Sequence, residues 1–204
     1  EMEITNGTTT TDDNGEFKID FIAKADKSVN KKYSPTYVYT VYADVTDING
    51  ETHSSTTYVR VGYKALNINI GMSDKINKND VDTINFTTTN LNGEFEAAAG
   101  NVKIWSLKMP AKIYKKRYWS KGDVHLMSKN EFEKYFPMDE FEEENNVYKW
   151  EKNIKVYDHD FNTANKKSLR LFKLPEWSSG WYVMEAVTKD KFGQEVKEIK
   201  YFNV

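Results

Sequence analysis

Apolar and polar residues alternate in short runs along this chain of 204 residues, and turn-forming residues separate the runs. In one of the first runs, Phe17, Ile19 and Phe21 alternate with charged residues. A period of two places every second side chain on the same face, which is typical of a half-buried β-strand. Similar runs continue towards the C-terminus, with Asn-Gly or Asp-x-x-Gly between several of them. The pattern predicts an all-β protein made of antiparallel strands.

One strand–turn–strand pattern occurs twice. It spans residues 39–51 and returns at residues 182–195. Two copies of one hairpin at a fixed offset indicate two related β-sandwich domains in series. A shift of 143 positions brings five residues onto their counterparts: Tyr39 onto Tyr182, Val41 onto Met184, Ala43 onto Ala186, Asp47 onto Asp190 and Gly50 onto Gly193.

The two predicted domains differ in completeness. Residues 1–63 offer about four strands, whereas a sandwich usually has about seven. We therefore expect residues 1–63 to be the C-terminal part of a domain that is truncated at its N-terminal side. The chain opens in strand-like sequence without an initiating Met, which indicates a piece of a longer protein. Residues 64–204 are expected to form a complete sandwich with an insertion at residues 110–147.

The insertion is predicted to hold one short helix. Ser128 and Glu131 have the spacing of a capping box, in which each side chain satisfies a backbone amide of the other residue. We expect the helix over residues 131–136, with Phe132, Tyr135 and Phe136 on one side. Pro137 ends it, because proline cannot continue the ladder of helical hydrogen bonds.

Composition excludes several classes of function. Lys and Arg number 29 against 31 Asp and Glu, and a net charge of −2 gives no electrostatic case for nucleic acid or an acidic membrane surface. The absence of Cys excludes disulfides, thiolate metal sites and Cys nucleophiles within this chain. No apolar run approaches the roughly 18 residues of a membrane-spanning helix. No Gly-x-Ser-x-Gly nucleophile elbow is present, which argues against Ser-His-Asp chemistry. No other residue cluster indicates a chemistry by itself, so we expect neither an enzyme nor a cofactor.

Several motifs resemble the bacterial alpha-2-macroglobulin family, and together they cover nearly the whole chain. The first, in residues 12–23, reads Asp-x-Asn-Gly-Glu-Phe-x-Ile-x-Phe-x-Ala. The second, in residues 39–52, reads Tyr-Thr-Val-x-Ala-Asp-Val-Thr-Asp-Ile-Asn-Gly-Glu-Thr. Residues 59–66, 88–94 and 128–137 carry shorter matches.

The resemblance implies macroglobulin-like domains, which are seven-stranded sandwiches of fibronectin-like shape strung in a row. It implies an exported protein of the periplasm or cell envelope, anchored as a lipoprotein through a more N-terminal segment, that traps proteases. Neither the bait region nor the Cys-Gln thioester of the family can be placed here, because the chain has no Cys and no recognisable bait loop. This segment would be a non-enzymatic scaffold, with neighbouring domains and target proteases as its partners.

Three polar clusters offer sharper interpretations. Asp158, His159 and Asp160 have metal-binding side chains, but neighbours on one strand face opposite ways, so we favour a polar loop. Residues 142–144 are consecutive glutamates, and a solvated loop is favoured over a glycosidase pair, whose carboxylates must face each other across a sugar. The oxygen-rich turn that begins at Asp47 could bind calcium, yet turn formation accounts for its residues.

One segment of the insertion mixes cations with aromatic side chains and is the candidate partner contact. An alternative function is therefore a surface adhesin or carbohydrate-binding module. The opposing interpretation is that the aromatic residues pin the insertion onto the sandwich while the lysines stay hydrated. Exposed edges of the truncated domain could also produce an artificial dimer. The candidate contact residues are Tyr114, Lys115, Lys116, Arg117, Tyr118 and Trp119.

Overall fold

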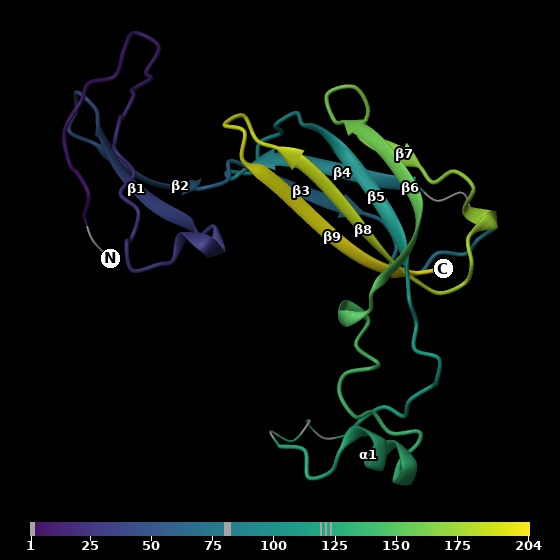
Figure 1. Cartoon of the computed structure of the whole chain (residues 1–204). Coiled ribbons are helices and arrows are strands. Elements are labelled where there is room, and N and C mark those ends of the chain that lie inside the picture. The colour runs from purple at the N-terminus through teal and green to yellow at the C-terminus, as the bar shows by residue number, and fades with distance from the viewer. Residues whose placement is uncertain (1–2, 80–82, 119, 121, 123) are drawn as a thin grey trace. The chain divides into compact units, whose positions relative to one another are not determined.

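The computed structural model describes residues 3–79, 83–118, 120, 122 and 124–204, and the chain divides into two compact units. The first unit comprises Glu1–Ala65 and Leu91–Glu94. The second comprises Leu66–Asn90 and Phe95–Val204. The regular secondary structure of the described residues is mostly strands in antiparallel sheets, with one α-helix, so the all-β prediction is confirmed (Figure 1).

The described residues of the second unit form a sandwich of seven strands in two sheets. One sheet has the order β3–β4–β7 and the other β6–β5–β8–β9. In constant-type immunoglobulin domains the fourth strand joins the sheet of the first two. Here the fourth strand of this unit, β6, pairs with β5 in the other sheet. The strands are β3 (Leu66–Gly71), β4 (Thr83–Asn90), β5 (Ala99–Leu107), β6 (Lys152–Asn162), β7 (Ser168–Arg170), β8 (Trp181–Lys189) and β9 (Glu195–Asn203).

The core lies between these two sheets. Along β3 the buried residues are Leu66, Ile68 and Ile70, and the residues between them are exposed. This alternation is what a strand with one buried face requires. Phe86 of β4 stacks on Phe161 of β6 with ring centroids 4.5 Å apart, which joins the inner faces of the two sheets.

A buried tyrosine anchors the start of β8. Tyr182 is 1% exposed, and its hydroxyl donates a hydrogen bond to the carbonyl oxygen of Ser178 at 2.6 Å. A tyrosine at this position, bonded to backbone a few residues upstream, is the tyrosine corner of sandwich domains. Its ring lies between Trp177 and Phe202, with centroids 5.2 and 5.6 Å away. Burial raises the pKa of Tyr182, so the hydroxyl remains a donor.

The first unit contains a single long hairpin of β1 (Thr36–Thr46) and β2 (Thr52–Gly62), preceded by a 3₁₀ turn at Lys31–Tyr33. The strand predicted around Phe17, Ile19 and Phe21 is wrong, because residues 16–26 form no strand. The residues alternate as expected, but a strand also needs a partner for its backbone groups. No strand among the described residues pairs with this segment.

The β1–β2 and β8–β9 hairpins have the same register. Tyr39 lies opposite Val59 in the first, and Tyr182 lies opposite Phe202 in the second. A shift of 143 positions carries both members of the first pair onto the second. The repeat therefore extends from the residue pattern to the strand pairing.

Both hairpins also close with the same turn. Asp47 Oδ1 accepts hydrogen bonds from the amides of residues 49 and 51 at 2.8 and 2.9 Å. Asp190 Oδ1 accepts from residues 192 and 194 at 2.9 and 2.8 Å. Gly50 and Gly193 have φ of 84° and 81°, where other residues are strained. The hydrogen bonds to Asp47 confirm the turn interpretation of this aspartate, and the bond from the amide of residue 51 contributes most to lowering its pKa.

The insertion between β5 and β6 contains helix α1 (Lys129–Tyr135) and a 3₁₀ turn at Val147–Lys149. The predicted capping box is present, with the Ser128 hydroxyl accepting from the Glu131 amide and the Glu131 carboxylate accepting from the Ser128 amide. A further 3₁₀ turn, Leu174–Glu176, precedes β8. No helix in the described part of the chain is long and apolar enough to cross a membrane.

We predict that Gly100→Ala destabilises the sandwich by about 2–4 kcal/mol. A Cβ at Gly100 would collide with the Val187 carbonyl oxygen and lie 2.9 Å from Phe161 Cζ. The matched control is Gly71→Ala, also in a strand, whose Cβ would meet Asn85 Cβ at an ordinary 3.4 Å. Chemical denaturation monitored by tryptophan fluorescence measures both. Equal stability losses in the two variants would contradict the packing argument.

Candidate contact site in the insertion

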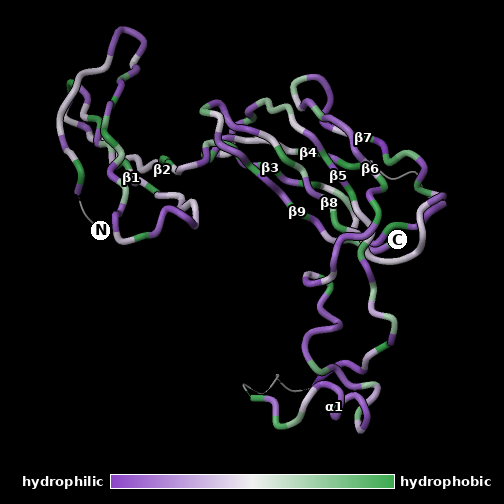
Figure 2. The backbone as a smooth tube through the Cα atoms, in the orientation of Figure 1, coloured by the Kyte–Doolittle hydropathy of each residue, from purple (hydrophilic) through white to green (hydrophobic). Residues whose placement is uncertain are grey.

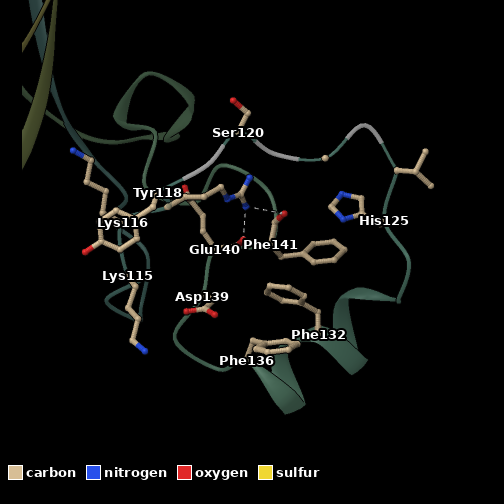
Figure 3. Close-up of a pocket in the computed structure, with 13 residues that line it drawn as sticks. Lys115, Lys116, Tyr118, Ser120, His125, Phe132, Phe136, Asp139, Glu140 and Phe141 are labelled. Atoms are coloured by element: carbon tan, nitrogen blue, oxygen red, sulfur yellow. Dashed lines mark hydrogen bonds between the residues drawn. The ribbon is translucent and has the colours of Figure 1, made fainter.

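Four of the six predicted contact residues line a cavity of about 450 Å³ within the insertion. Lys115, Lys116 and Tyr118 lie on one side of it, and His125, Phe132 and Phe136 lie on the other (Figure 3). Tyr114 is not part of the lining, and Trp119 lies outside the described residues. The complete lining is Lys115, Lys116, Arg117, Tyr118, Ser120, Gly122, Val124, His125, Phe132, Phe136, Asp139, Glu140 and Phe141.

Arg117 joins the basic segment to the acidic loop that follows the helix. Its Nη2 donates to the carbonyl oxygens of Glu140, Phe141 and Glu142, the last two at 3.4 and 3.3 Å. The amide of Lys115 donates to the Met138 carbonyl oxygen at 2.7 Å, close to the same junction. A guanidinium offers five donors in a planar fork, which suits a cluster of carbonyls. Arg117 therefore has a structural role in closing the acidic loop.

Aromatic rings form the opposite wall of the cavity. His125 stacks on Phe141 with centroids 4.1 Å apart, and its Nε2 lies 3.1 Å from Glu142 Oε1. Phe132 packs against Phe136 at 5.2 Å and against Phe141 at 5.3 Å. These rings give the insertion a small apolar cluster of its own. The cation–aromatic segment marks the basic side of the cavity in the sequence, and the acidic loop at 139–144 does lie beside it, but no motif indicates that His125 stacks on Phe141.

The Asp158–His159–Asp160 cluster lies on strand β6, so the prediction of a polar loop there is wrong. Both aspartates accept hydrogen bonds from Asn101 Nδ2, at 3.0 and 2.8 Å. The bonds from Lys155 and Asn101 lower the pKa of Asp158. The ring of His159 contacts those of Tyr157 and Phe172, with centroids 4.5 and 5.9 Å away. These residues pair with β5, and β6 therefore extends through them. The hydrogen bonds from Asn101 link the two strands further.

The run of glutamates is tied into the insertion by lysines and a histidine. Glu142 contacts His125, Glu143 pairs with Lys149, and Glu144 Oε1 lies 3.6 Å from Lys129 Nζ. Each carboxylate therefore has a separate cationic or imidazole neighbour. Within the described ranges, no group of three or more His, Cys, Asp or Glu side chains is arranged to hold a metal ion.

The cavity lining combines basic residues, the acidic Asp139 and Glu140, and aromatic faces, which suits contact with a polar ring such as a sugar. Comparisons with known proteins add no precedent: no family model, no curated protein and no solved structure matches this chain.

We predict that Arg117→Ala opens the acidic loop without unfolding the sandwich. Loss of charge-assisted hydrogen bonds to three carbonyls should speed amide exchange in residues 139–146 by about tenfold or more. Lys116→Ala, at an exposed neighbouring position, is the matched control and should leave these amides unchanged. Hydrogen-exchange mass spectrometry reads both variants, with β8 as the internal reference. Unchanged exchange in Arg117→Ala would show that the guanidinium does not hold the loop.

Proposed function

We propose that this chain is a non-enzymatic scaffold segment of a bacterial alpha-2-macroglobulin-like protein, a broad-spectrum inhibitor that traps proteases in the periplasm or cell envelope. The observation that carries the proposal is the hairpin repeated at an offset of 143 residues in the same register. Repetition of one unit along the chain is what a string of similar domains produces. The alpha-2-macroglobulin assignment itself rests on the motifs in residues 12–23 and 39–52.

The construction of the second unit supports a mechanical role. Its core is continuous between two sheets, and Phe86 and Ile84 of one sheet are as fully buried as Ile104 and Met184 of the other. Close-packed interiors have low compressibility and transmit strain. Such a domain keeps its shape while its neighbours move. In a protease trap, this segment would hold adjacent domains at fixed angles until cleavage elsewhere releases them.

The macroglobulin-like interpretation of the sandwich draws further support from its topology. The second unit has seven strands, a tyrosine corner at Tyr182 and an insertion between its third and fourth strands. Fibronectin-like sandwiches share this general architecture without sequence similarity. Many functions use such folds, so the sandwich supports a scaffold role but does not identify the protein as a protease trap. Protease trapping is tested on the whole protein.

The full-length protein should shield a bound protease from large substrates only. After incubation with trypsin, cleavage of a protein substrate should fall strongly while cleavage of a small chromogenic peptide continues, because a trapped protease stays active behind a steric barrier. The 204-residue segment alone is the control and should change neither activity. Undiminished cleavage of the protein substrate would rule out the inhibitor, and equal loss of both activities would indicate ordinary active-site blockage.

A second candidate, a carbohydrate-binding module, is favoured by one observation: Tyr118 is 91% exposed beside the cavity. An exposed aromatic ring next to a concave surface can stack against a sugar. In titrations against a glycan panel, this function requires saturable binding that Tyr118→Ala or Trp119→Ala weakens by about tenfold. Tyr148→Ala, at another exposed tyrosine, is the control. The scaffold role predicts no saturable binding in any of these proteins.

A further inference from the structure

The β1–β2 hairpin has an edge that its repeat does not have. In the second unit, β8 lies between β5 and β9. In the first unit, the described residues supply only β2, the counterpart of β9, and the sheet has two strands. One side of β8 pairs with β5. The corresponding side of β1 has no such partner in the described part of the chain and forms a sheet edge. Unpaired strand edges bind further strands readily.

The face of this hairpin that corresponds to the core of the second unit is open as well. Val45 is 41% exposed, whereas its counterpart Thr188 is 3% exposed. Val41 is half-buried, whereas its counterpart Met184 is fully buried. The contrast repeats at the other apolar positions: Ala43 and Val59 are half-buried, while Ala186 and Phe202 are fully buried. Figure 2 marks hydrophobic residues along β1 in green.

Physical chemistry disfavours such a hairpin on its own. Two strands alone are at best marginally stable in water, and three or more strands or a packed second layer are needed. Tyr39 is the only buried apolar side chain among the described residues of the first unit. Eleven-residue strands with one apolar face therefore need a cover to be stable.

The repeat indicates what that cover is. The edge of β8 is filled by an antiparallel strand in which Gly100 to Ser106 lie opposite Thr188 to Tyr182. Val102 and Ile104 of that strand are fully buried opposite Ala186 and Met184. The β3–β4–β7 sheet covers the remaining apolar face, so the second copy supplies a template for both missing parts of the first.

We propose that β1–β2 is the last hairpin of a second β-sandwich, completed by strands of the same polypeptide that precede residue 1. One of these strands lies antiparallel to β1 opposite Tyr39–Val45, in the register that β5 has with β8. Its residues opposite Val41 and Ala43 are apolar and point into a new core. This completion is independent of the inhibitor role, and it holds whether or not the protein traps proteases.

The test compares the 204-residue protein with a version extended by the natural upstream sequence to the length of one sandwich, on the order of 100 residues for the first domain. Hydrogen-exchange mass spectrometry measures the amides of β1, and β8 in the same molecule is the reference. In the extended protein, exchange in β1 should slow by about tenfold or more and approach that of β8. Analytical ultracentrifugation of both proteins should give monomers.

Two matched variants of the extended protein test the proposed face. Val41→Lys places a charge where Met184 is buried in the repeat, and it should abolish the gain in protection of β1. Tyr42→Lys, at the neighbouring position on the other face, corresponds to Glu185 and should leave the gain intact. Protection of β8 in both variants shows that the second unit is folded.

Three results would overturn the proposal. Equal exchange in β1 of the extended and 204-residue proteins would show that the upstream strands do not cover it. A protected β1 in a monomeric 204-residue protein would show that the hairpin needs no cover. A dimer of the 204-residue protein that persists in the extended form and is lost in Val41→Lys would identify a second copy as the occupant.

Discussion

A long antiparallel hairpin with one apolar face is stable only if other apolar side chains cover that face and exclude water. This constraint organises the chain. In the second unit it is met by β5 at the edge and by β3, β4 and β7 across the core. Tyr182 is then fully buried and bonds to its own backbone upstream. The same hairpin in the first unit has the same turn and register but only Tyr39 buried. The turn and register of the hairpin are thus set by its own residues. Its stability depends on the strands that cover it.

The insertion meets the same constraint in a different way. Its rings are not part of the core between the sheets. They pack on one another through Phe132, Phe136, Phe141 and His125. The acidic loop has no strand partner for its carbonyl oxygens among the described residues. The guanidinium of Arg117 donates hydrogen bonds to several of them instead. A small aromatic cluster closed by one arginine leaves a cavity, since a few side chains cannot fill space as a two-sheet core does.

Features set by neighbouring residues were predictable from the sequence, and features set by distant pairing were not. The capping box of Ser128 and the aspartate turns follow from local hydrogen bonding, which a short motif contains in full. The segment at Phe17 has a strand pattern without a strand, because pairing depends on residues elsewhere. Asp158 and Asp160 were assigned to a loop for the converse reason, since Asn101, far away in sequence, holds them on β6. The stacking of His125 on Phe141 has no periodic signature at all.

The two corner tyrosines show how far the first unit already follows the sandwich plan. Tyr182 donates to a carbonyl four residues upstream, whereas Tyr39 donates to the carbonyl of Lys24, 15 residues upstream, at 3.0 Å. The ring of Phe21 lies 5.5 Å from that of Tyr39. The alternating segment is therefore held against the hairpin by a tyrosine hydroxyl and a ring contact, although it pairs with no strand among the described residues. The corner position of the hairpin therefore fixes an upstream segment through side-chain contacts alone, before any strand pairing does so.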